Sequence, residues 1–138
     1  MIGCVLRASG SEFDVDAFLD DSPFEPCAVW RRGEQRFRHK PPSENSGFNL
    51  EVSDGDLAEQ VAGAVVFLED DRAEILRLLA MIGVEAHLDF GIARRDVFVQ
   101  TDFFPSVLIG LAGSLGLGIE LSQYPVSNEP EVETAVVS

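Results

Sequence analysis

The chain of 138 residues contains few cysteines and few basic side chains. Its two cysteines, Cys4 and Cys27, lack a C-x-x-C spacing, so they supply neither a disulfide framework nor a zinc site, and we expect free thiols in a reducing cytoplasm. Ten basic residues face 24 acidic ones, which gives a formal charge of −14. Direct binding to nucleic acid or to an anionic membrane surface is therefore disfavoured, because both need a dominant basic field.

Long apolar runs are missing as well. No run approaches the ~18 residues of a membrane span, and the first residues lack the basic leader and apolar stretch of a signal peptide. Hydrophobic residues nevertheless make up 46% of the chain, which is the share of a globular protein. We expect a single α+β domain over residues 1–125, followed by an acidic, flexible tail over 126–138.

Apolar residues alternate with polar ones in some segments and follow helical spacing in others. Strands are expected at 2–7, 27–31, 48–53, 84–90, 96–100 and 119–124. Helices are expected after Asp14, after Asp54-Gly55-Asp56 with a bend at Glu69-Asp70-Asp71, and from Pro105. This order predicts a mostly antiparallel six-stranded sheet with helices on one face. Residues 1–90 then form a ferredoxin-like βαββαβ unit, which a βαβ-type C-terminal part extends.

One face of such a sheet meets solvent or a partner. Glu85, His87 and Asp89 lie on the same side of one strand, because side chains alternate with period two, and Glu51 and Glu120 can join them from other strands. We predict that this face docks a basic protein. A metal or acid–base site is the alternative reading, but one histidine with scattered carboxylates is a poor ligand set. No catalytic motif occurs, so we expect no catalytic residue, metal or cofactor.

Half of the basic residues lie between Arg31 and Lys40. Guanidinium groups can clamp a carboxylate or phosphate, and a tryptophan can add a stacking face. The segment thus predicts an anion site made of Trp30, Arg31, Arg32, Arg36 and Arg38. The alternative is that Trp30 belongs to the core while the basic side chains pair with surrounding carboxylates.

Phe103 and Phe104 are adjacent aromatic residues ahead of Pro105. Two neighbouring rings do not both face inward easily, so we expect one of them at a sheet edge or a dimer contact. Together with an edge strand, this pair is compatible with a homodimer.

Several short motifs resemble an uncharacterised bacterial family of unknown function. They are Leu6-x-x-x-Gly10, Phe13-Asp14-Val15, Pro26, the W-x-K/R-G-E element at Trp30-Arg31-Arg32-Gly33-Glu34, and Leu111-Ala112-x-x-Leu115-Gly116-Leu117 with Tyr124-Pro125. Near Gly47-Phe48 the chain departs from the pattern, where relatives more often place a tryptophan. Some small acidic relatives look like immunity proteins that neutralise toxins, so the resemblance implies an immunity-type inhibitor.

Besides a hydrolase or metal enzyme on the sheet face, these observations leave two functions open. The first is a non-enzymatic cytoplasmic module that binds a basic protein, such as a toxin, through the acidic sheet face. The second is a sensor or binding domain for a small anionic ligand that uses the basic segment from Arg31 to Lys40.

Overall fold

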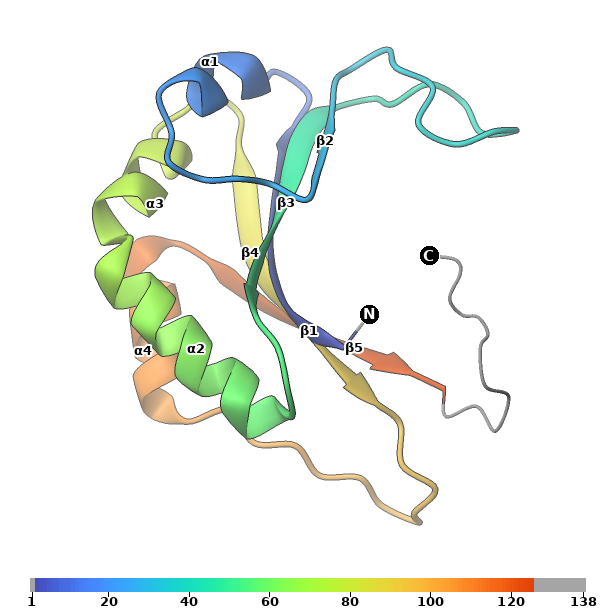
Figure 1. The fold of residues 1–138 in the computed structure, drawn as a ribbon, viewed down its shortest axis with the longest axis vertical. Coiled ribbons are helices and arrows are strands. Elements are labelled where there is room, and N and C mark those ends of the chain that lie inside the picture. Colours follow the sequence, from blue (N-terminus) through green and yellow to red (C-terminus); the bar gives the residue numbers. More distant parts are fainter. Residues whose placement is uncertain (1, 126–138) are drawn as a thin grey trace.

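The computed structural model describes residues 2–125, which form one mixed sheet of five strands covered by four helices on one face (Figure 1). The acidic tail expected at 126–138 lies outside the described residues. The elements follow the chain as β1 (Gly3–Gly10), α1 (Val15–Asp20), β2 (Ala28–Trp30), β3 (Ser46–Ser53), α2 (Leu57–Asp70), α3 (Arg72–Leu79), β4 (Glu85–Ala93), α4 (Ser106–Leu115) and β5 (Gly118–Tyr124).

The strands lie side by side in the order β2-β3-β1-β4-β5. Strand β1 is antiparallel to both of its neighbours, β3 and β4, and β2 is antiparallel to β3. Strand β5 instead runs parallel to β4, because helix α4 carries the chain back between them. The α+β class is therefore confirmed, whereas the six-stranded sheet is wrong.

The missing strand is the one expected at residues 96–100. Strand β4 pairs with β1 on one side and with β5 on the other, so it has no free edge for a hairpin partner. Residues 96–100 form no strand, and Val97, Phe98 and Val99 are exposed. Their apolar character mimics a strand, but the parallel pairing of β5 depends on a distant segment that local alternation does not reveal.

The helix boundaries follow the capping residues. The Asp14 carboxylate accepts the Ala17 N–H at 3.1 Å, and Asp56 with Glu59 forms a complete capping box at the start of α2. The bend expected near Asp71 separates α2 from α3, and Gly116 ends α4 in the left-handed conformation (φ 88°).

The core lies between the helices and one face of the sheet. Leu6, Phe48, Leu88 and Phe90 face the helices from three neighbouring strands, and each is completely buried. Phe18 of α1 stacks on Phe48 with ring centroids 5.7 Å apart. The described helices cover this face alone, and we call the opposite face, which no described helix covers, the open face.

Candidate functional site

The open face is built from residues that are paired across neighbouring strands, since paired residues lie on the same side of a sheet. The pairing between neighbouring strands arranges these residues in three rows that run across the sheet. They are Trp30, Gly47, Ser9 and Glu85; then Ala28, Asn49, Arg7, His87 and Gly118; then Glu51, Val5, Asp89 and Glu120.

Asp89 lies near the middle of the open face but is only 5% exposed. Its carboxylate accepts a hydrogen bond from Arg7 Nε at 2.9 Å and another from the Ser122 hydroxyl at 2.7 Å. Both oxygens are therefore engaged within the chain. Of the residues predicted for docking a basic partner, Asp89 is the one that the structure withdraws from the surface.

The other predicted docking residues are more accessible. Glu51, Glu85 and Glu120 are exposed, and His87 Nε2 lies 3.1 Å from Glu120 Oε1. Arg7 and Arg36 also line this face, so its charge is mixed rather than uniformly acidic. Within residues 2–125, no three His, Cys, Asp or Glu side chains come close enough to hold a metal ion.

The basic segment does not converge on a single anion. The Arg31 guanidinium turns towards α1 and binds the Asp16 carboxylate through two hydrogen bonds of 2.7 and 2.8 Å. These hydrogen bonds lower the pKa of Asp16, and together with the Asp16 charge they raise the pKa of Arg31. Arg32 instead donates to the Ser11 carbonyl at 3.3 Å. Arg31 therefore points towards the helices, and neither arginine lines the pocket that contains Arg36.

Trp30 and Arg36 behave differently from the rest of the segment. Trp30 is 7% exposed and lies over Gly47 on the open face, where its Nε1 donates to Asn45 Oδ1 at 2.9 Å. The Arg36 guanidinium lies 3.8 Å above the centre of the Trp30 ring. Burial against the ring lowers the pKa of Arg36, an effect that the nearby charge of Glu34 opposes. Trp30 thus belongs neither to the helix-covered core nor to a cluster of all five predicted residues.

A shallow pocket of about 270 Å³ opens beside this stacked pair. It is lined by Arg7, Ala8, Ser9, Trp30, Arg36, Asn49 and His87. The side-chain oxygen of Asn49 is buried and has no hydrogen-bond partner within the described chain. Only Trp30 and Arg36 come from the segment that the sequence predicts to bind an anion; Arg38 forms no ion pair within residues 2–125.

Sequence reasoning missed Arg7 and Asn49 as pocket residues. Alternation places Arg7 on the same side of β1 as Ser9, but it does not show which strands flank β1. The register brings Arg7 opposite Asn49 on one side and His87 on the other. A single basic residue inside an otherwise apolar strand, Cys4 to Ala8, was the available signal.

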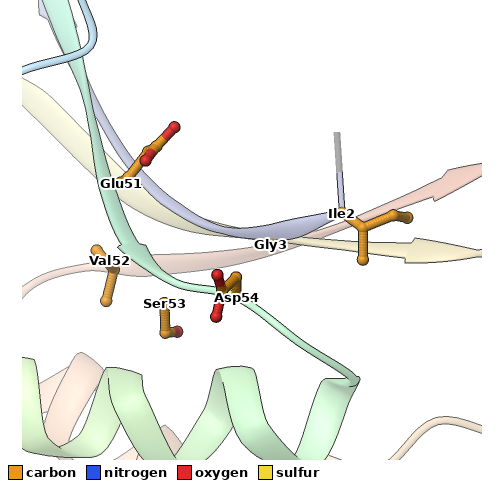
Figure 2. A pocket seen from close by; sticks show the side chains of 6 residues that line it. All are labelled: Ile2, Gly3, Glu51, Val52, Ser53 and Asp54. Carbon is orange, nitrogen blue, oxygen red and sulfur yellow. The ribbon is translucent and has the colours of Figure 1, made fainter. Parts of the chain in front are cut away.

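A larger depression of about 460 Å³ lies where β3 ends beside the start of β1. In Figure 2, Val52 and Ser53 point towards helix α2 while Glu51 points to the other side of the strand. Glu51 and Asp54 are its charged lining residues, and neither forms an ion pair with another described residue. Because Glu51 and Ser53 point to opposite sides of the strand, these polar groups do not converge on one ligand.

Comparisons with known proteins add no family or relative: no family model, no curated protein and no solved structure matches the chain. Over the described residues, none of the helices is both long and apolar enough to cross a membrane.

Proposed function

We propose that this chain is a non-enzymatic binding domain, and that the pocket beside Trp30 holds a small anion such as a carboxylate or phosphate. The observation that carries the proposal is the state of Arg36. Its guanidinium is stacked on Trp30 and pairs with no carboxylate among the described residues, although the chain contains 24 acidic side chains. An anion would supply the missing charge.

Arg7 supports the same proposal from the other side of the pocket. Asp89 accepts a hydrogen bond from Nε of Arg7, which holds the Arg7 guanidinium in place. The two terminal nitrogens of that guanidinium have no hydrogen-bond partner in the described chain. Two guanidinium groups that line one pocket can each donate to the same anion. Because the Arg36 guanidinium covers the Trp30 ring, a planar ligand would stack on that guanidinium, so we expect aromatic carboxylates to bind more tightly than acetate.

Fluorescence of Trp30, the only tryptophan, tests this proposal directly. The protein would be titrated with inorganic phosphate, benzoate and acetate at constant ionic strength, with calorimetry as a second readout. We expect Arg36→Ala to weaken binding about 10- to 150-fold, since one charge-assisted hydrogen bond contributes about 1.5–3 kcal/mol. Arg38→Ala is the matched control from the same loop and leaves the affinity unchanged. If millimolar anion produces neither a change in Trp30 fluorescence nor a calorimetric heat of binding, the proposal is overturned.

A protein partner is the second candidate, and the distribution of acidic residues favours it. Exposed carboxylates gather on and around α1, namely those of Glu12, Asp14, Asp16, Asp20, Asp21 and Glu25. The end of α2 adds Glu69 and Asp70 beside α3. A basic protein would be attracted to this helical surface as well as to Glu51, Glu85 and Glu120.

An immunity-type inhibitor of a basic toxin is one form of this second candidate, and the family resemblance of the sequence motifs supports it. Capture at low salt with wild type, Glu85→Lys and Asp20→Lys would locate such a partner. A partner whose binding depends on Glu85 uses the open face, and one that depends on Asp20 uses the helical surface. If both variants still capture the partner, or if the wild type captures no partner at low salt, this candidate is contradicted.

A ferredoxin-like description of residues 1–90 and a cytoplasmic location belong to the same proposal. The antiparallel order β2-β3-β1-β4 supports the first. The presence of free Cys4 and Cys27 supports the second, because unpaired thiols are typical of reducing compartments.

A further inference from the structure

Within the described residues, strand β5 is a long edge strand with few of the usual protective features, since Glu120 is its one charged side chain. It is the last strand in the order of the sheet, and no described strand pairs with its outer side. Natural edge strands are kept from pairing by short length, lysine, proline or a bulge. The opposite edge, β2, has only three residues, whereas β5 has seven and contains neither lysine nor proline.

The helix beside this edge exposes apolar side chains. Val107 and Ile109 of α4 are 53% and 52% exposed, and Phe103 just ahead of the helix is 76% exposed. An apolar pocket of about 330 Å³ joins α4 to the start of β5 and is lined by Phe104, Ile109, Ala112, Gly113, Leu117 and Ile119. A Cβ atom added at Gly110 or Gly113 would meet nothing within 4 Å, so another helix can approach closely there.

Charge indicates what covers this surface. Residues 103–119 contain no charged side chain, although the whole chain carries −14. The nearest carboxylate, Glu120 of β5, lies on the open face, opposite to α4, where its Oε1 is 3.1 Å from His87 Nε2. A basic partner would find no carboxylate on α4. A second copy of this chain is repelled from most of the acidic surface, but at α4 two copies meet without bringing like charges together. An isologous interface requires such self-compatibility.

We infer that the outer edge of β5 and the exposed face of α4 form the interface of a homodimer. Two β5 strands pair antiparallel about a two-fold axis and satisfy each other's outward backbone groups, which joins the two sheets into one. The two α4 helices then lie next to each other on the same side of that sheet, where Ile109 of each copy enters the apolar pocket region of the other. This interface is independent of the anion pocket on the open face.

Sedimentation of the full chain over a range of concentrations tests the inference. We expect a dimer that Ile109→Glu converts to a monomer, because each copy would then bury a carboxylate in the apolar pocket region of the other. Val66→Glu is the matched control: Val66 is 55% exposed on α2, away from β5, and its substitution leaves the dimer intact. Circular dichroism shows that both variants remain folded.

Hydrogen exchange of the β5 amides separates the remaining outcomes. Protection that grows with protein concentration and disappears in Ile109→Glu supports strand pairing between copies. A monomer with rapidly exchanging β5 amides overturns the inference. A monomer with protected β5 amides also overturns it, because the edge would then be covered without a second copy. A dimer that persists in Ile109→Glu places the interface elsewhere.

Discussion

Arg7 and Asp89 lie diagonally across the open face, and the Arg7 Nε donates to Asp89 Oδ2 at 2.9 Å. Asp89 is almost completely buried, whereas a third of the Arg7 side chain is exposed. The pair therefore neutralises the carboxylate nearest the centre of the face and leaves the outer part of the guanidinium available to the pocket.

We expect Asp89→Asn to lower the free energy of unfolding by about 2 kcal/mol. The amide removes the charge that pairs with Arg7 and leaves a partly buried guanidinium with a weaker partner. Urea unfolding at pH 7 measures the change. Glu85→Gln is the control on the same strand, and because Glu85 is exposed its effect stays within about 0.5 kcal/mol. Equal stability of the two variants would show that the buried pair contributes nothing.

Gly47 is the second position where the open face depends on close contact. An added Cβ would lie 2.7 Å from the Trp30 ring and 2.3 Å from the backbone oxygen of Ala8. We expect Gly47→Ala to destabilise the fold by about 1–3 kcal/mol, because the backbone of β1 cannot move away freely. The same substitution displaces the tryptophan, so its fluorescence emission shifts to longer wavelength. An unshifted emission spectrum would mean that Trp30 is not held against Gly47.

The sequence predicts most of the local structure because the relevant signals are local. Asp14 and Asp56 cap the helices that follow them, and the alternation of Glu85, His87 and Asp89 places them on one face of β4. Phe103 and Phe104 also divide as expected: Phe103 is exposed, while the Phe104 ring lies 5.2 Å from that of Phe90. In each case neighbouring residues contain the whole signal.

The pocket could not be predicted in this way, because its residues come from distant parts of the chain. Arg36 belongs to a loop, Arg7 and Asn49 to different strands, and their meeting depends on the register of β1 with β3. From the sequence, Arg31 and Arg36 are equally good candidates for binding an anion. In the fold, however, Arg31 pairs with Asp16 of α1, outside the pocket. Which arginine stays unpaired is a property of the tertiary fold alone.

The two cysteines should differ strongly in reactivity. Burial, and secondarily the charge of Asp89, raises the pKa of Cys4 to about 12, which the hydrogen bond with Ser53 only partly opposes. Cys27 is exposed. We therefore expect a thiol reagent at pH 8 to label one cysteine of the native chain rapidly and the second only after unfolding, because the thiolate is the reactive form. Cys27→Ser abolishes the rapid phase, and rapid labelling that survives in this variant would contradict the burial of Cys4.

The ion pair between Glu74 and Arg77 on α3 makes stability depend on pH. Arg77 Nη2 lies 2.9 Å from Glu74 Oε2 and also donates to the Phe18 carbonyl, which ties α3 to α1. The hydrogen bond from Arg77 lowers the pKa of Glu74 below its ordinary value of 4.5. A carboxyl with a lower pKa in the folded chain stabilises the fold above the unfolded pKa, and that contribution disappears as the pH falls through the folded pKa.

We therefore expect Glu74→Gln to be less stable than wild type at pH 7, with the difference shrinking as the pH falls below about 4.5, where wild type loses the same contribution. Urea unfolding of both proteins at pH 7, 5, 4 and 3 measures it. Glu69→Gln, an exposed residue of α2 that forms no ion pair within residues 2–125, serves as the control with a stability difference that stays small at every pH. A Glu74→Gln difference that is constant from pH 7 to pH 3 would show that packing, and not the charge of Glu74, joins α3 to α1.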